Sequence, residues 1–416
     1  MSVFFYNIFI QVYLVGIRVA ALNNPKATLW LQGRLHIFDA LQQWANGVSK
    51  YTKIVWVHCA SLGEFEQARP IIEKLRLTYP SSRILLTFFS PSGYQIRKNF
   101  KGVDAVFYLP IDTKKNAKQF LKIVKPSLVI WVKYDYWYHY LTQLKQQQIP
   151  VLLVSAIFSP NQPFFKWYGY LWKKMLQTFT HLFVQNEASL SLLCAHSLGY
   201  NAILAGDTRF DRVIDIANNM ESTPALIASF CQSHTVIVAG STWLDDELAL
   251  VHYARTQPQI KFIIAPHEVD NARIAELKKL FTSAVLYSQL TEYNANAHVL
   301  IIDNIGMLAS LYPLATVAYI GGGFNASGIH NILEAAVHAK PIIFGSEYHK
   351  FNEATSLIAL GGAYSIDTAL QLEALLNKLL SQPMLMAEVG AINKNYVYSQ
   401  SGATDIIMQQ VRQIVA

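Results

Sequence analysis

Short apolar runs alternate with helix-patterned stretches along most of the chain, and this alternation constrains the fold more than any other feature. The first half has such runs at Ile54–His58, Arg83–Phe88, Ala105–Tyr108, Leu128–Val132, Val151–Ser155 and His181–Val184. The second half has them at Thr235–Ala239, Lys261–Ala265, Val299–Ile302, Val317–Ile320 and Pro341–Phe344. Continuous apolar runs separated by helices are typical of parallel strands buried on both faces. The pattern therefore predicts an α/β fold with parallel sheets.

The length of the chain predicts more than one domain, because 416 residues are too many for one ordinary core. We expect two Rossmann-like domains facing a cleft, an N-terminal one over residues 23–206 and a C-terminal one over residues 207–416. The last helix is a candidate for packing back on the N-terminal domain. Ligands of open α/β sheets bind beyond the carboxyl ends of the strands. The cleft is therefore the expected active site.

The N-terminal segment Val3–Leu22 is about long enough to span a bilayer. Its polar residues, Arg18 among them, are unfavourable in a helix that only spans a bilayer. No signal-peptide cleavage site stands out. It predicts a retained membrane-anchor helix over residues 1–22, either spanning or interfacial; a buried first helix is the alternative. Positive residues begin at its C-terminal end, which by the positive-inside rule places the body of the protein in the cytoplasm.

Charge is unevenly distributed between the two halves. Met1–Gly206 has 22 Lys and Arg against 8 Asp and Glu, a balance of +14, whereas the remainder has 12 against 19, a balance of −7. A basic half favours an anionic partner, although a solvated basic surface would also account for it. Together with the anchor it favours a membrane surface over nucleic acid, for which no reader motif is recognised.

A Gly-rich segment, Tyr319–Gly345, follows one of the predicted strands. Glycines permit close backbone approach, and the N–H groups at the start of a helix bind phosphate. A helix is expected to open near His330-Asn331, with Glu334 one turn in, where it could accept hydrogen bonds from a ribose. The segment lacks the G-x-G-x-x-G spacing, and a tight turn is the alternative explanation.

Two further strand ends in the second half carry polar residues. Ser241 and Thr242 are candidates to cap a helix or hold a phosphate. The acids Asp245–Glu247 follow directly and are explained as first-turn residues, so no metal site is predicted. His267 follows the next predicted strand, and either a ligand contact or a structural role would fit it.

The turn SLGE, Ser61 to Glu64, joins the first predicted strand to a helix. Glu64 is either an ordinary first-turn acid that complements the helix dipole or a general base held over a cleft. The small residues Ser61 and Gly63 would leave room for a substrate. The turn alone does not decide between these roles.

Taken in order, these motifs resemble the Kdo transferases of lipid A assembly, Kdo being 3-deoxy-D-manno-oct-2-ulosonic acid. The resemblance covers nearly the whole chain, and SLGE and GIHNILEAA are its most specific parts. It rests on the N-terminal anchor and on HCASLGEFEQARPII, LLTFFSPSGYQ, YLPID, FVQNE, GDTRFDR, GSTWLDDE, GGGFNASGIHNILEAA and GSEYHKFNEA.

The resemblance implies a GT-B glycosyltransferase with an N-terminal acceptor domain and a C-terminal CMP-Kdo domain. It implies inverting transfer of Kdo to a lipid A precursor at the inner membrane, with neither metal nor other cofactor. Glu64 would then be the base, Glu334 would hold the ribose, and Asn331 would lie near the phosphate. Acceptor candidates are Ser61, Gly63, Arg69 and Asp135; the other donor candidates are Arg209, Ser241, Thr242, His267, Gly322, Gly323 and Gly328.

The chain departs from the family pattern in three places. The usual Glu-x-Glu-x-Trp-Pro begins here with Lys133, so that Asp135 is a candidate replacement for an acid. His267 lacks a preceding arginine, and Asp207 stands where Asn is usual. Two alternatives stay open: a related enzyme that uses a UDP-sugar, and a catalytically inactive membrane-bound binding protein.

Overall fold

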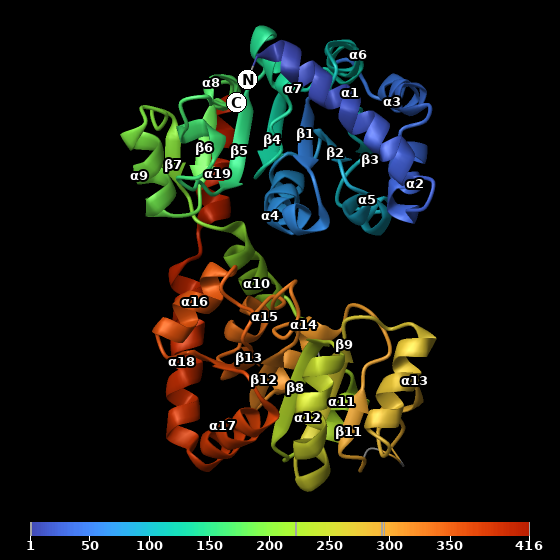
Figure 1. Cartoon of the computed structure of the whole chain (residues 1–416), viewed down its shortest axis with the longest axis vertical. Coiled ribbons are helices and arrows are strands. Elements are labelled where there is room, and N and C mark those ends of the chain that lie inside the picture. Colours follow the sequence, from blue (N-terminus) through green and yellow to red (C-terminus); the bar gives the residue numbers. More distant parts are fainter. Residues whose placement is uncertain (1, 221–222, 293, 295, 416) are drawn as a thin grey trace. The chain divides into compact units, whose positions relative to one another are not determined.

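The structure, a computed structural model, describes residues 2–220, 223–292, 294 and 296–415 and divides into two compact units (Figure 1). The first unit contains residues 1–212 and 401–416, and the second contains residues 213–400. The sequence placed the boundary at residue 206. Residues 207–212 belong to the first unit because Asp207 and Arg212 bind side chains of its fourth helix, namely Gln67 and Glu73.

A parallel sheet of seven strands forms the centre of the first unit, in the order β3-β2-β1-β4-β5-β6-β7. Its strands are β1 (Ile54–Cys59), β2 (Arg83–Phe88), β3 (Ala105–Tyr108), β4 (Leu128–Val132), β5 (Val151–Ala156), β6 (His181–Val184) and β7 (Ala202–Leu204). Its helices are α1 (Val3–Ala20), α2 (Pro25–Gln32), α3 (Ile37–Asn46), α4 (Leu62–Thr78), α5 (Pro91–Arg97), α6 (Lys114–Val124), α7 (Tyr138–Gln146), α8 (Tyr170–Leu176), α9 (Glu187–Ala195), α10 (Thr208–Asn218, which continues into the second unit) and α19 (Ala403–Val415).

The second unit repeats this architecture, with the strand order β10-β11-β9-β8-β12-β13-β14. Its strands are β8 (Val236–Thr242), β9 (Lys261–Pro266), β10 (Val285–Leu286), β11 (Val299–Ile301), β12 (Val317–Ile320), β13 (Ile342–Gly345) and β14 (Ala363–Ile366). Its helices are α11 (Ala225–Cys231), α12 (Leu244–Thr256), α13 (Asn271–Leu280), α14 (Leu308–Leu311), α15 (Leu333–Ala336), α16 (Asn352–Ala359), α17 (Ala369–Ser381) and α18 (Pro383–Ser399).

The predicted α/β class with two parallel sheets is confirmed. Each predicted run forms a strand, with ends that differ by at most three residues. The sequence missed β7, β10 and β14, which are two to four residues long. All three are edge strands with partly exposed residues, so they lack the long apolar run of a strand that is buried on both faces.

Helices cover both faces of the first sheet. One face packs against α1, α3, α6, α7 and α8, and the other packs against α4 and α19. The contribution of α19 comes from Ile407, Met408, Val411 and Val415, which are all buried with α4. The last helix of the chain therefore completes the core of the first unit.

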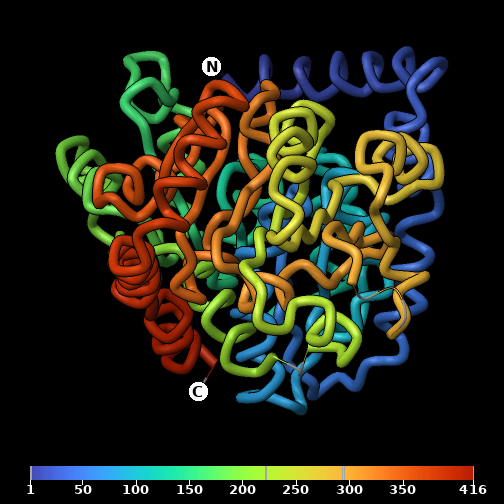
Figure 2. The backbone as a smooth tube through the Cα atoms, turned by 90° about the horizontal axis from the view of Figure 1, so that it is seen from below, coloured from blue at the N-terminus to red at the C-terminus, as the bar shows by residue number. Residues whose placement is uncertain are grey.

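Helix α1 lies along the surface of the first unit, where Figure 2 shows it as a long regular helix. It is the one helix among the described residues that is long and apolar enough to cross a membrane. Tyr6 and Ile10 are buried against the unit, and the Tyr6 hydroxyl donates to Asp112 at 2.5 Å. Asn7 Oδ1 lies 2.7 Å from His139 Nε2. Polar contacts on one side therefore fix α1 to the first unit.

Candidate active site

The residues around Glu64 come together because the order of the first sheet reverses between β1 and β4. Neighbouring strands at such a switch point leave a crevice beyond their carboxyl ends. Ser61, Gly63 and Glu64 follow β1, whereas Lys133 and Tyr134 follow β4. With Gln67 and Arg209 they line a pocket of about 280 Å³.

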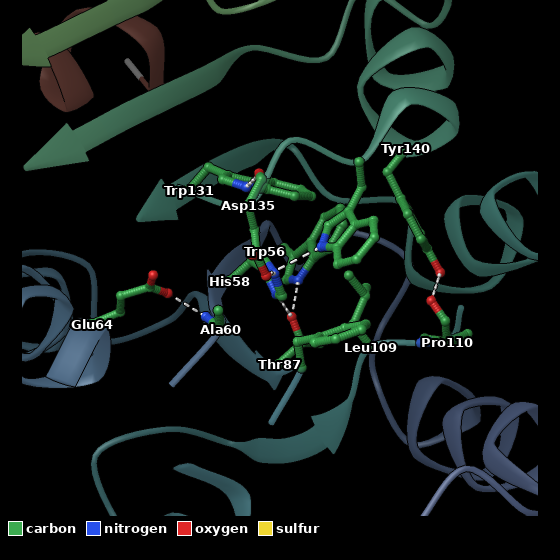
Figure 3. A network of polar contacts seen from close by, with 12 residues as sticks. Trp56, His58, Ala60, Glu64, Thr87, Leu109, Pro110, Trp131, Asp135 and Tyr140 are labelled. Carbon is green, nitrogen blue, oxygen red and sulfur yellow. Dashed lines mark hydrogen bonds and ion pairs between the residues drawn. The ribbon is translucent and has the colours of Figure 1, made fainter. Parts of the chain in front are cut away.

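Glu64 lies in the first turn of α4, and its carboxylate accepts the backbone N–H of Ala60 (Figure 3). The side chain is 8% exposed. Burial, and after it the negative charge of Asp135, raise the pKa of Glu64 to about 7. The Ala60 N–H and the Lys133 ammonium oppose this rise. A carboxylate with a pKa near 7 can both take and give a proton at neutral pH.

Asp135 is held behind the pocket by rings at the ends of β1 and β4. Its Oδ2 lies 3.4 Å from Nε2 of the buried His58 and accepts the Trp137 indole N–H at 3.2 Å. The other ring nitrogen of His58 lies 2.9 Å from the Thr87 hydroxyl (Figure 3). Asp135 does not line the pocket and acts on Glu64 through its charge. Its predicted contact with an acceptor stays a prediction.

Replacing Asp135 by Asn is expected to lower the pKa of Glu64 below about 7, because it removes a negative charge that disfavours the ionised form. The base would then stay ionised at more acidic pH. Carbon-13 NMR titration of glutamate-labelled protein measures this pKa, with the signal assigned from a Glu64→Gln sample. The exposed Asp39→Asn is the charge-matched control. An unchanged Glu64 titration in Asp135→Asn would contradict the coupling.

Arg209, predicted to contact the donor, lies on the wall of the Glu64 pocket. The buried Asp207 orients it, since its carboxylate accepts the Arg209 backbone N–H at 2.9 Å and Nε at 2.9 Å. Gln67 Nε2 lies 3.3 Å from both Asp207 oxygens. The pocket therefore combines one carboxylate, Glu64, with two cations, Lys133 and Arg209. The sequence missed Gln67, Lys133 and Tyr134 as lining residues.

Arg69 is not brought to this pocket. Its Nε donates to Glu73 at 2.9 Å, and Arg212 binds the other oxygen of the same carboxylate at 3.0 Å. The two arginines thus share one acid on the surface of α4. The predicted contact of Arg69 with an acceptor stays a prediction.

In the second unit, the predicted donor residues gather at an equivalent reversal of strand order, between β8 and β12. Gly322 has φ +93°, a conformation that favours glycine. A Cβ on Gly323 would lie 2.5 Å from the backbone nitrogen of Gly345. The positive φ at Gly322 and the close approach of the backbone at Gly323 therefore require glycine at both positions. Gly328, with φ +81°, lies in the same loop.

Asp246 fixes the Gly-rich loop to the first turn of α12. It is 1% exposed and accepts the Gly322 N–H at 2.9 Å, the Trp243 N–H at 2.9 Å and the Tyr319 hydroxyl at 2.8 Å. The sequence predicted that Asp246 lies in the first turn of a helix, but it did not predict that Asp246 holds the Gly-rich loop. Burial raises the pKa of Asp246, and the three donors oppose that rise.

Of the two roles expected for Ser241 and Thr242, the helix cap was wrong, whereas the contact with a donor phosphate stays a prediction. The N-cap is Trp243, because β8 runs on through Thr242. The buried Thr242 hydroxyl donates instead to Glu247 at 2.9 Å, and Glu247 also binds Arg273. Ser241 adopts φ +54° at the strand end.

Three rings stack at the carboxyl end of the second sheet. His267 stacks against both Trp243 and His330, with centroid distances of 4.6 and 4.5 Å. The Trp243 indole N–H donates to His330 Nε2 at 3.3 Å. Burial and the adjacent His267 lower the pKa of His330 to about 4, so that it is neutral at pH 7. The sequence singled out only His267, since the stack depends on three different loops.

Asn331 and Glu334 contact each other. The Asn331 amide donates to Glu334 at 3.0 Å, and its Oδ1 accepts the Leu333 N–H at 3.2 Å. The helix they begin, α15, is only four residues long. Among the described residues, no group of three or more His, Cys, Asp or Glu side chains could hold a metal ion.

Comparison with known proteins identifies relatives of the first unit and of the whole fold. Residues 32–212 match the family model for 3-deoxy-D-manno-octulosonic-acid transferase (kdotransferase). The 3-deoxy-D-manno-octulosonic acid transferase of Aquifex aeolicus is 28% identical over 79% of this chain and 86% of that protein. The Haemophilus influenzae enzyme of the same name is 25% identical over 86% of each chain.

Two further matches extend this comparison. A bifunctional glycosyltransferase/methyltransferase of Fusobacterium nucleatum is 26% identical over 71% of this chain, which spans about half of that protein's length (48%). A structure of UDP-GlcNAc 2-epimerase from Neisseria meningitidis bound to UDP-GlcNAc has a TM-score of 0.63, with 16% identity over 87% of this chain and all of the other. The second match bears on the fold alone.

The twin parallel sheets and the sequence relatives are those of a glycosyltransferase of the GT-B type. The sequence is similar to the Kdo transferases, whose family model matches residues 32–212 and whose members from Aquifex aeolicus and Haemophilus influenzae are 28% and 25% identical to it.

Proposed function

We propose that the protein transfers Kdo from CMP-Kdo to a sugar hydroxyl of a lipid A precursor, with inversion and without a metal in the transfer step. The observation that carries this proposal is the Glu64 carboxylate, whose pKa of about 7 suits a base that takes a proton at neutral pH. The acceptor oxygen bonds to the anomeric carbon while the bond from that carbon to the CMP phosphate breaks. The proton goes to Glu64, and CMP leaves with the electron pair.

The two cations beside Glu64 support an anionic substrate in the first unit. Kdo carries a carboxylate, and lipid A precursors carry phosphates. Arg209, which Asp207 orients, and Lys133 both line the pocket and would place positive charge beside such a group. Gln67 Oε1 has no partner among the described residues, and a hydroxyl bound in the pocket would satisfy it.

The second unit is proposed to bind the cytidine nucleotide. Stacked Trp243, His267 and His330 offer a flat aromatic surface next to the Gly-rich loop. Glu334, paired with Asn331, offers a carboxylate to the ribose hydroxyls. The resemblance to a UDP-GlcNAc 2-epimerase is confined to the fold, whereas the Aquifex aeolicus and Haemophilus influenzae sequence relatives are Kdo transferases. A CMP-sugar is therefore favoured over a UDP-sugar.

Mass spectrometry of a lipid A precursor incubated with CMP-Kdo and the purified protein tests this function. We expect a mass increase of one or more Kdo residues that persists in EDTA. Calorimetry should show binding of CMP in preference to UDP. A preference for UDP, or an unmodified acceptor under conditions where CMP binds, would contradict the proposal. The same spectra give the number of Kdo residues added.

We also propose that α1 lies in the membrane interface. Phe4, Phe5, Phe9, Val12 and Val19 are each more than half exposed on the side that faces away from Tyr6 and Ile10. The contacts of Tyr6 and Asn7 with the first unit hold the helix against the protein, which favours an interfacial placement over a span. The cytoplasmic face of the inner membrane remains the expected location.

The double variant Phe5→Ser, Phe9→Ser is expected to weaken partitioning into neutral phosphatidylcholine vesicles by about tenfold or more, because each buried Phe contributes roughly 1.5–3 kcal/mol. Flotation measures the bound fraction. The control Leu370→Ser, Met384→Ser changes two exposed apolar residues of the second unit and should leave binding unchanged. Equal losses in both variants would contradict the placement of α1.

A further inference from the structure

A second pocket of the first unit lies between α7 and α8, apart from the residues around Glu64. Its volume is about 540 Å³, within the range of roughly 300–1,000 Å³ typical of small-molecule sites. Leu144, Met175 and Leu176, which are fully or almost fully buried, pack α7 against α8. The pocket is therefore preformed by the core.

The lining of this pocket is cationic. Lys145 of α7 and Lys173 and Lys174 of α8 line it, and none of its described lining residues is an acid. One lysine in the last turn of a helix complements the helix dipole. Three ammonium groups around one pocket exceed that need, and their mutual repulsion favours a bound anion.

The remaining lining groups suit a phosphate. Thr142 and Tyr170 offer hydroxyl donors, whereas the Thr178 hydroxyl already donates to the Met175 carbonyl oxygen at 2.6 Å. Lys145 uses one of its three N–H donors on the Gln177 carbonyl oxygen at 3.0 Å, so that its position is fixed while donors remain. Phosphate oxygens accept such charge-assisted hydrogen bonds strongly.

The surroundings of the pocket indicate where the phosphate comes from. Tyr170 is 73% exposed, and the preceding Trp167 is 94% exposed. Trp and Tyr are enriched where a protein meets the headgroups of a bilayer. Helices α7 and α8 pack on the same face of the sheet as α1, and Figures 1 and 2 both place the segment before α8 near the N-terminal end of α1.

We propose that this pocket binds the phosphate of an anionic lipid headgroup at the membrane surface on which α1 lies. The inference rests on the proposed membrane placement of α1 and is independent of the sugar transfer. The lipid would be held beside the protein's own apolar contact with the bilayer. The pocket would thus make membrane binding depend on lipid charge, whereas α1 makes it depend on apolar burial.

The test is flotation of the full chain with phosphatidylcholine vesicles that contain or lack phosphatidylglycerol. The variant Lys145→Gln, Lys173→Gln, Lys174→Gln should lower partitioning into the anionic vesicles by about tenfold or more and leave neutral vesicles unaffected. The control Lys278→Gln, Lys279→Gln, Lys378→Gln removes equal charge from exposed positions of α13 and α17 and should change it by less than about twofold. Circular dichroism verifies that both variants fold.

Equal losses of binding to anionic vesicles in the two triple variants would overturn the proposed lipid site, since the overall charge of the protein would then explain the binding. Equilibrium dialysis with inorganic phosphate separates the sources of the ligand. If the Lys145, Lys173, Lys174 variant loses phosphate binding and keeps vesicle binding unchanged, the ligand is a soluble phosphate. That result would contradict the proposal that it is a lipid headgroup. Wild-type protein that binds anionic but not neutral vesicles would contradict the placement of α1 while supporting the pocket. Wild-type protein that binds neither anionic nor neutral vesicles would contradict both the placement of α1 and the lipid site.

Discussion

Replacing Glu64 by Gln is expected to lower kcat for Kdo transfer by about 10²–10⁴, because an amide cannot take the acceptor proton. The substitution preserves the size of the side chain and removes only the titrating group. Donor binding should survive, since the proposed nucleotide site belongs to the second unit. Steady-state kinetics with CMP-Kdo, together with calorimetry for CMP, measure the two effects separately.

Glu66→Gln is the matched control for this prediction. Glu66 lies on the same turn of α4, where it pairs with Arg97 at 2.8 Å and does not line the pocket. It should retain kcat within about threefold, as surface substitutions away from a site usually do. Equal losses in Glu64→Gln and Glu66→Gln would mean that the turn, and not the base, matters. Full activity of Glu64→Gln would remove Glu64 from the mechanism.

Replacing Asp246 by Ala is expected to destabilise the second unit by about 3–5 kcal/mol. The variant removes the acceptor of three hydrogen bonds and leaves buried donors on Gly322 and Tyr319 unpaired. The Gly-rich loop also loses its tie to α12, so that CMP binding should weaken along with stability. Urea unfolding, followed by a probe of the second unit, gives the change in free energy.

Asp245→Ala gives the comparison, because Asp245 precedes Asp246 and is exposed. If Asp246 acted only through the helix dipole, the two variants would each cost about 0.3–1 kcal/mol. A loss of stability in Asp246→Ala that is no larger than in Asp245→Ala would therefore show that the three hydrogen bonds contribute little. A large difference would identify Asp246 as a residue that positions the loop.

The α/β class, the two sheets and the position of the SLGE turn after the first strand could be predicted from sequence because their signals are local. Apolar runs mark buried parallel strands wherever they occur, and small residues next to Glu64 mark the end of β1. The helix cap was mispredicted because Ser241 and Thr242 are capping residue types, yet β8 continues through both. Hydrogen bonding to the neighbouring strands outweighed the local preference.

The sequence by itself determined most of the strands, all but β7, β10 and β14, and where Glu64 and the Gly-rich loop lie along the chain. It did not determine which residues surround them, because strand order is not contained in hydrophobic periodicity. Only the tertiary structure placed β4 beside β1, and with it Lys133 and Tyr134 beside Glu64. The raised pKa of Glu64 was decided at the same level, since it results from burial and from the charge of Asp135, 71 positions away along the chain.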